Sequence, residues 1–103
     1  MASRDDIIAL LQQHHASLSR EYGVRRIGLF GSFARGSSTG ASDVDLVIEF
    51  DRPIGLRFVE LAERLEHLLG RNVDIVTPAG IRGIRIPGVA DDIEQSVIYV
   101  EAN

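Results

Sequence analysis

The amino-terminal part of the chain carries a helical pattern of core-type residues. These positions recur at helical spacing up to Gly23, and they are Ile7, Leu11, His14 or His15, Leu18 and Tyr22. Ser3 followed by Asp6 forms an approximate capping pair at the start of the pattern. We therefore expect an amphipathic helix that ends at Gly23, because glycine favours the left-handed conformation that follows a last helical turn.

Two stretches typical of β-strands follow this helix. Val24 to Phe30 is apolar and β-branched, and it stops at the turn-forming residues Gly31 and Ser32. After a loop rich in glycine and serine from Gly36 to Ser42, apolar and polar residues alternate: Val44, Leu46, Ile48 and Phe50 with Asp43, Asp45, Val47 and Glu49. A period of two predicts a strand with one buried face, so the two aspartates share its other face.

A second helix and further strands are predicted downstream. Apolar residues at helical spacing from Phe58 to Leu69, closed by Gly70, indicate a long helix. Val73 to Thr77 has the composition of a third strand, and Val97 to Val100 that of a closing one. The glycines and Pro87 from Ala79 to Gly88 disfavour a helix there, whereas a short helix is compatible with Val89 to Gln95.

This order of elements predicts the fold class. Helices and strands are interspersed, which is typical of an α/β (α+β) fold with a small mixed β-sheet flanked by helices. The 103 residues, 45% of them hydrophobic, suit one compact domain. Because no internal repeat or linker is visible, we expect residues 1–103 to form a single domain without a separate substrate-binding domain.

Composition excludes several kinds of chemistry. The chain has no cysteine, which rules out disulfides, thiolate metal sites and a cysteine nucleophile. All 11 basic residues are arginine, so a Walker-type phosphate loop and a Schiff-base lysine are also excluded. A net charge of −4 argues against binding long nucleic acid. No apolar run is long enough for a membrane span, and Met1 to Leu11 is unlike a signal peptide, so we expect a cytoplasmic protein that makes no membrane contact.

Three aspartates form the candidate metal site. Asp43 and Asp45 lie roughly 6.6 Å apart along one face of a strand, and without a cation they repel each other by about 2.5 kcal/mol at an effective dielectric constant of about 20. Asp74 lies between Val73 and Ile75, opposite the buried face of its own strand. If the strands are neighbours, three hard oxygen ligands meet, which suits Mg²⁺ or Mn²⁺ and two-metal phosphoryl transfer.

Gly31 and Ser32 supply a candidate phosphate cradle. They stand where a strand ends and where residues Phe33 to Arg35 can begin a short helix, whose first amides bind phosphate oxygens. An isolated Asp-x-Asp is usually a solvated strand face, and an isolated Gly-Ser is usually a turn. The ordered set of strand, Gly-Ser turn, spacer, Asp43-Val44-Asp45, helix and Asp74 favours an active site over these ordinary explanations.

The string GSFARGSSTGASDVDL, together with Asn72 to Val76, resembles the DNA polymerase beta-like nucleotidyltransferase superfamily, and more closely its minimal nucleotidyltransferase (MNT) branch. The resemblance covers nearly the whole chain and implies the nucleotidyltransferase fold. It assigns Asp43, Asp45 and Asp74 to the metal-binding catalytic triad. It also assigns Gly31 and Ser32, and with them Arg35, to nucleotide binding, although a surface role would equally explain Arg35.

The resemblance implies a reaction and a partner. An acceptor hydroxyl attacks the α-phosphorus of ATP bound through two Mg²⁺ ions, pyrophosphate leaves, and Asp74 is the candidate acceptor of the hydroxyl proton. Members of this branch are commonly antitoxins paired with HEPN-domain toxins, and some transfer AMP onto a tyrosine of the toxin. This chain departs from the family pattern in its glycine-broken segment Gly80 to Gly88 and in its lack of lysine.

Two other functions are compatible with the same residues: an antitoxin that acts by binding alone, and a nucleotidyltransferase that modifies a small molecule such as an aminoglycoside. The modified group, the number of nucleotides transferred, the preferred base and homo-oligomerisation are left open. His14 and His15 point about 100° apart on a helix and cannot ligate one ion together. For His67, and for Arg25, Arg26, Arg82 and Arg85, a solvated surface is the favoured interpretation over a place in the active cleft.

Overall fold

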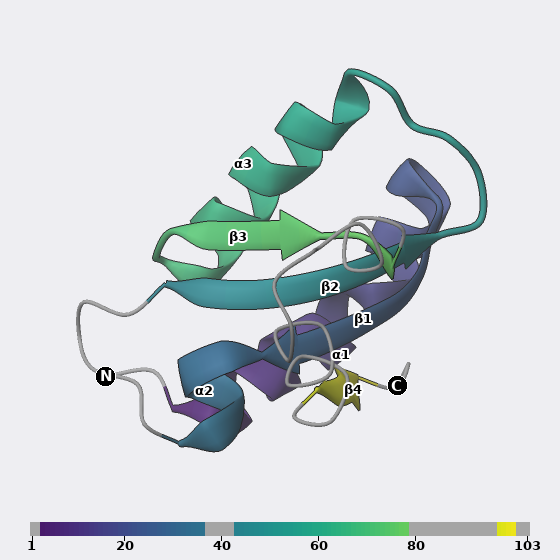
Figure 1. The fold of residues 1–103 in the computed structure, drawn as a ribbon. Coiled ribbons are helices and arrows are strands. Elements are labelled where there is room, and N and C mark those ends of the chain that lie inside the picture. Colours follow the sequence, from purple (N-terminus) through teal and green to yellow (C-terminus); the bar gives the residue numbers. More distant parts are fainter. Residues whose placement is uncertain (1–2, 37–42, 79–96, 101–103) are drawn as a thin grey trace, which may run out of the picture.

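The computed structural model describes residues 3–36, 43–78 and 97–100. Its helices are α1 (Arg4–Tyr22), α2 (Gly31–Arg35) and α3 (Arg57–Leu69), and its strands are β1 (Val24–Phe30), β2 (Val44–Phe50), β3 (Val73–Val76) and β4 (Ile98–Val100). The strands form one sheet in the order β3-β2-β1-β4. The pair β2–β3 is parallel, whereas β1 pairs antiparallel with both β2 and β4 (Figure 1). The predicted mixed sheet with helices is confirmed.

The ends of α1 follow the sequence prediction closely. Ser3 and Asp6 form a complete capping box, in which each side chain accepts a hydrogen bond from the other residue's backbone N–H. At the other end Gly23 adopts a left-handed conformation, and its N–H donates to the Ser19 carbonyl. The helix therefore starts and stops where its local sequence satisfies its free backbone groups.

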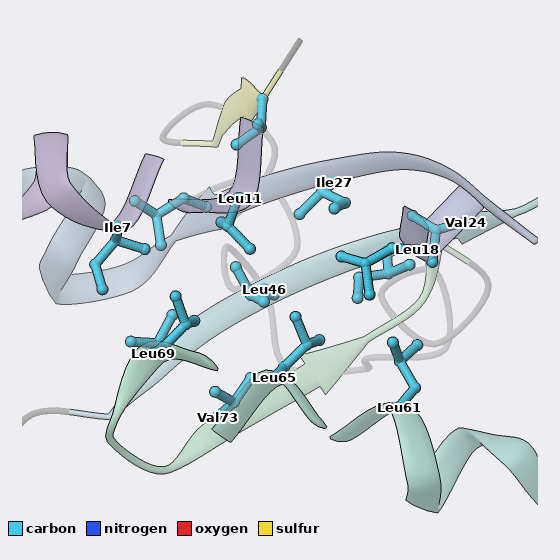
Figure 2. Close-up of a cluster of buried hydrophobic side chains, with 14 of the residues drawn as sticks. Ile7, Leu11, Leu18, Val24, Ile27, Leu46, Leu61, Leu65, Leu69 and Val73 are labelled. Atoms are coloured by element: carbon cyan, nitrogen blue, oxygen red, sulfur yellow. The ribbon is translucent and has the colours of Figure 1, made fainter. Parts of the chain in front are cut away.

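The hydrophobic core lies between the sheet and the two long helices. In α3 the buried residues Leu61, Leu65 and Leu69 recur every fourth position and face the sheet. Figure 2 shows them opposite residues of α1 and of the central strands. The labelled members of this cluster are Ile7, Leu11, Leu18, Val24, Ile27, Leu46, Leu61, Leu65, Leu69 and Val73. Burial of these side chains fixes which face of each strand turns away from the helices.

Two details of β2 differ from the sequence prediction. The strand begins at Val44, so Asp43 lies just before it and is exposed. Val47, expected on the polar face, is only 5% exposed. The reason is Gly28 on β1, because a Cβ atom there would lie within 3 Å of Val47 Cγ1 and of Val97 Cγ2. The absence of a side chain lets Val47 and Val97 close over β1 on the face opposite the helices.

Two predictions for the carboxyl-terminal region have different outcomes. The closing strand is confirmed, as β4 pairs with β1. The segment from Gly80 to Gly88 and the short helix at Val89 to Gln95 lie outside the described residues. Within the described parts of the chain, no helix has the length and apolar character needed to cross a membrane.

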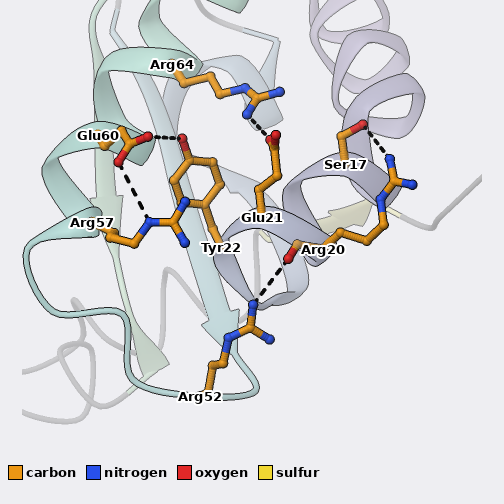
Figure 3. A network of polar contacts seen from close by, with 8 residues as sticks. All are labelled: Ser17, Arg20, Glu21, Tyr22, Arg52, Arg57, Glu60 and Arg64. Atoms are coloured by element: carbon orange, nitrogen blue, oxygen red, sulfur yellow. Dashed lines mark hydrogen bonds and ion pairs between the residues drawn. The ribbon is translucent and has the colours of Figure 1, made fainter.

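A polar network joins the end of α1 to the start of α3 (Figure 3). The Tyr22 hydroxyl donates a hydrogen bond of 3.1 Å to Glu60 Oε1, and the Arg57 guanidinium carbon lies 4.8 Å from the centre of the Tyr22 ring. Arg64 pairs with Glu21 beside them. Burial, followed by the Glu60 contact, raises the pKa of Tyr22 above its ordinary value of 10.0. Here opposite charges are matched around a tyrosine that is only 2% exposed.

Candidate active site

The strand register brings Asp45 and Asp74 side by side. Asp45 on β2 is the direct partner of Asp74 on the parallel strand β3, and of Phe30 on β1. Adjacent strands lie about 4.8 Å apart, and directly paired residues project to the same face. Asp43 lies one residue before β2, at the same edge of the sheet, by which we mean the end at which β2 and β3 begin. The condition that the sequence left open, that the strands of Asp45 and Asp74 are neighbours, is therefore met.

Gly31 is the point where β1 turns into α2 against Asp45. Its φ of +74° belongs to the left-handed region that glycine adopts readily. A Cβ atom at this position would collide with the Asp45 carboxylate. Two independent restrictions, conformation and space, therefore require glycine here, and they place the first turn of α2 directly beside Asp45.

The charges around Asp45 show which groups surround it. Its side chain is partly buried, and burial raises its pKa above the ordinary value of 3.8. The negative charges of Asp74 and then of Asp43 raise it further, whereas Arg35 at the end of α2 lowers it. The repulsion from Asp74 exceeds that from Asp43, which reverses the emphasis of the sequence argument. Pairing across neighbouring strands brings two residues closer than a spacing of two along one strand.

The donor groups at this edge suit hard divalent cations. Carboxylate oxygens are the preferred ligands of Mg²⁺ and Mn²⁺, and a cation would relieve the repulsion that raises the pKa of Asp45. In residues 3–36, 43–78 and 97–100, no three acidic, histidine or cysteine side chains are grouped closely enough to hold an ion as they stand. The three aspartates thus share one edge of the sheet, but their side chains do not converge on one point.

The remaining predicted positions lie as follows. Ser32 is partly buried in the first turn of α2, and Arg35 is exposed at its end. Arg26 lies over the Tyr99 ring at 3.8 Å and forms an ion pair with Glu49, not with one of the three aspartates of the site. His15 lies on the buried face of α1, and His67 is exposed on α3. Arg82 and Arg85 lie outside the described residues.

A hollow of about 740 Å³ borders the other end of β2, between Phe50, Ile54 and Phe58. It lies apart from Asp43, Asp45 and Asp74, and its lining is largely apolar with only scattered charged groups. The chemistry required for phosphoryl transfer is carboxylate oxygen next to backbone amides, and this combination occurs at the Asp45 edge. We therefore place the candidate site there rather than in this hollow.

One support of the site has no short-range sequence signal. Glu66, a whole turn before the end of α3, accepts a hydrogen bond of 3.2 Å from the backbone N–H of Val73, the first residue of β3. Next to it, the N–H of Val44 donates to the Asn72 carbonyl at 2.9 Å. These two hydrogen bonds fix where β3 begins relative to β2, and they thereby hold Asp74 in register with Asp45. The helical pattern alone presents Glu66 as an ordinary polar position.

Comparison with known proteins assigns the family. The nucleotidyltransferase domain family matches residues 11–100. The chain is 39% identical over 101 residues to protein adenylyltransferase MntA of Thermococcus cleftensis, covering 97% of this chain and 98% of that protein. It is 40% identical over 103 residues to a "putative protein adenylyltransferase" of Methanocaldococcus jannaschii, covering 97% of this chain and all of the relative.

Solved structures agree with this assignment. A "putative minimal nucleotidyltransferase" superposes with a TM-score of 0.71 at 32% identity, covering 94% of this chain and 95% of that one. A tri-AMPylated HEPN toxin of Shewanella oneidensis in complex with its MNT antitoxin gives a TM-score of 0.59 at 19% identity over 93% of this chain and 73% of the matched one, a likeness of fold alone. The order of the elements, the Asp45 edge and these relatives together show that the chain belongs to the nucleotidyltransferase domain family, in its minimal, polymerase beta-like branch.

Proposed function

We propose that this protein is a Mg²⁺-dependent adenylyltransferase that transfers AMP from ATP to a tyrosine hydroxyl of a HEPN-domain toxin and thereby acts as its antitoxin. The observation that carries the proposal is the position of Asp45. It lies between Asp74 on the neighbouring strand and Gly31 at the start of α2, so cation ligands adjoin a phosphate cradle. The names of the relatives support the nucleotide and the type of acceptor.

The site residues divide the work of the reaction. Asp43, Asp45 and Asp74 would hold two Mg²⁺ ions, which supply positive charge to the triphosphate and to the acceptor oxygen. The backbone amides of Gly31 and Ser32, with the Ser32 hydroxyl, bind the phosphates of ATP. Arg35, which already lowers the pKa of Asp45, adds a cation at the rim for a phosphate oxygen.

The transfer forms one phosphorus–oxygen bond and breaks another. The tyrosine oxygen of the acceptor bonds to the α-phosphorus, the bond from this phosphorus to the bridging oxygen breaks, and pyrophosphate leaves with that electron pair. The hydroxyl proton passes to Asp74, which is exposed at the edge of the sheet where an acceptor can approach. Asp45 is less exposed and faces the cradle instead, so we assign it to holding the metal and not to the proton.

The acceptor in this proposal is a folded protein. We take residues 1–103 as one nucleotidyltransferase domain. The relatives are named protein adenylyltransferases, which supports a protein acceptor over an aminoglycoside. We place the reaction in the cytoplasm, where ATP is supplied.

The decisive experiment incubates the purified protein with ATP, Mg²⁺ and a cognate HEPN-domain protein. Intact-mass spectrometry should show the partner gaining AMP units on tyrosine, and Asp45→Asn should abolish the gain. If the partner stays unmodified while the folded wild-type protein still neutralises it, binding alone explains the antitoxin. Modification of an aminoglycoside in place of the partner would instead support a small-molecule acceptor.

A further inference from the structure

A cation–π contact joins α2, which begins with the Gly31-Ser32 cradle, to the turn before β3, which carries Asp74. The guanidinium carbon of Arg71 lies 4.9 Å from the centre of the Phe33 ring, within the range of a cation–π interaction. Phe33 is 1% exposed and Arg71 is partly buried. Such a contact is worth more when it is shielded from water, because water competes for the cation.

Each partner of this contact belongs to an element that carries site residues. Phe33 follows Gly31 and Ser32 directly in α2. Arg71 lies in the turn between α3 and β3, three residues before Asp74. The contact therefore connects the phosphate cradle to the strand of the third carboxylate, although α2 and that turn are far apart in the sequence.

Both ends of the connection are anchored. On one side, the Gly70 N–H donates to the Glu66 carbonyl and the Val73 N–H donates to the Glu66 carboxylate, so the turn that contains Arg71 is fixed to α3. On the other side, Arg4 of α1 donates a hydrogen bond of 3.3 Å to the Ala34 carbonyl of α2. A five-residue helix has little stability of its own. Its position must therefore come from such tertiary contacts.

We propose that Arg71 is a positioning residue that sets the distance between the Gly31-Ser32 cradle and Asp74 by stacking on Phe33. This inference rests on the proposed function for its activity measurements, but not for its nucleotide-binding measurements. Arg71 acts on the site through the cation–π contact of its guanidinium with the Phe33 ring, which holds α2 in place. An error of about 1 Å in the position of a binding group can reduce catalysis by about 100-fold.

The chain offers a matched control for this test. Arg57 stacks on Tyr22 at 4.8 Å, nearly the same distance as in the Arg71–Phe33 pair, and Tyr22 is also buried. That pair lies at the start of α3 (Figure 3), whereas Arg71 follows the end of this helix at Leu69. Arg57→Met and Arg71→Met therefore remove the same type of contact at opposite ends of one helix, and Arg57→Met also removes the exposed ion pair with Glu60.

The experiment measures melting temperature, the Kd for AMP-PNP with Mg²⁺, and KM and kcat for transfer from ATP. We expect Arg71→Met to raise Kd and KM about tenfold and to lower kcat about tenfold. We expect Arg71→Lys, which keeps a cation over the ring, to recover most of the loss. Arg57→Met should lower the melting temperature by a similar amount while Kd, KM and kcat change by less than about twofold.

Several outcomes would overturn the inference. Equal effects of Arg71→Met and Arg57→Met on Kd and KM would show that Arg71 is merely structural. If Arg71→Met does not fold, Arg71→Lys and Phe33→Leu, singly and combined, replace it. Additive effects of those two changes on Kd would then contradict the stacking role. A wild-type protein that binds AMP-PNP but transfers nothing would refute the proposed function and leave the Kd comparison decisive for Arg71. A wild-type protein that binds no nucleotide would refute both.

Discussion

The two ends of α3 solve opposite electrostatic problems. At its start, Glu60, Arg57 and Arg64 surround Tyr22 with alternating charges, and the hydrogen-bonding groups drawn in Figure 3 have partners. Beyond its end, Asp45 faces Asp74 across neighbouring strands and has Asp43 close by. At the start of α3, positive and negative groups are paired, as expected for a part of the fold that binds no ligand. The other end keeps like charges together beside a glycine that cannot carry a side chain.

The difference indicates where stability has been given up for function. Like charges at short range destabilise the unliganded fold, and ordinary packing gives no reason to keep them. Their presence at a single edge is explained if a bound cation neutralises them, because binding to the folded state then adds stability. We expect the end with paired charges to contribute to stability alone. Substitutions at the two ends should therefore affect activity and stability in different proportions.

The largest effect is expected from Gly31→Ala. The new Cβ atom collides with the Asp45 carboxylate and must also adopt a positive φ. We expect a loss of about 3 kcal/mol in unfolding free energy, together with loss of transfer activity. Gly55→Ala is the control, since Gly55 has a φ of +55° and, apart from its chain neighbours, no atom of the described residues lies within 4 Å of the place that its Cβ would take. It should lose only about 1–2 kcal/mol and keep its activity. Equal losses in both variants would contradict the close approach to Asp45.

Asp45→Asn should separate activity from stability. Transfer should fall by about 1,000-fold or more if Asp45 helps to hold the metal ions, whereas the metal-free variant should be at least as stable as wild type because a repulsive charge is gone. Glu49 is the matched acid on the same strand and face, paired with Arg26 at 3.3 Å. Glu49→Gln should keep activity and lose less than about 1 kcal/mol. Activity assays and urea denaturation without Mg²⁺ test both. A destabilised metal-free Asp45→Asn with normal activity would remove Asp45 from the site.

Tyr22→Phe should show the reverse pattern at the other end. It removes the hydroxyl that donates to Glu60, so we expect a loss of about 1 kcal/mol with unchanged transfer. The pKa of Tyr22 is raised, so the stability that its neutral form contributes is present below pH 10.0 and is lost as the pH rises through the folded-state pKa. Denaturation at alkaline pH should reveal this decline in wild type but less of it in Tyr22→Phe. A fall in activity would show that the two ends are coupled.

The smallest effect is the pH dependence of the metal-free protein at Asp45. Because its folded-state pKa lies above 3.8, the protonated carboxyl stabilises the fold below pH 3.8, and this stability is lost as the pH rises through the folded-state pKa. The difference in unfolding free energy between Asp45→Asn and wild type should thus grow in that window and stay constant towards neutrality. Urea denaturation at several pH values without Mg²⁺ measures it. A difference that is flat throughout would mean that burial and the neighbouring negative charges do not raise the pKa of Asp45.

Much of the fold was predictable because its signals are local. The capping box of Ser3 and Asp6, the left-handed glycines at positions 23 and 70, and the leucines of α3 are decided within a few residues of chain. The predicted order of helices and strands is confirmed for the described residues. The site prediction relied on strand alternation, which places Asp45 and Asp74 on the exposed faces of their strands without saying that these strands touch. The catalytic and metal-binding roles of the three aspartates, and the nucleotide-binding roles of Gly31, Ser32 and Arg35, remain predictions.

The sequence by itself determined which residues can form helices and strands and which chemistry is available. It also determined that a Gly-Ser turn and three carboxylates follow one another in the order typical of the nucleotidyltransferase family. Only the tertiary structure decided that Asp74 outweighs Asp43 as the neighbour of Asp45, that Gly28 lets Val47 become buried, and that Arg71 reaches Phe33. The physical reason is range. Caps, turns and alternation depend on groups a few bonds apart, whereas these contacts exist only after packing of the core has brought distant segments of the chain into register.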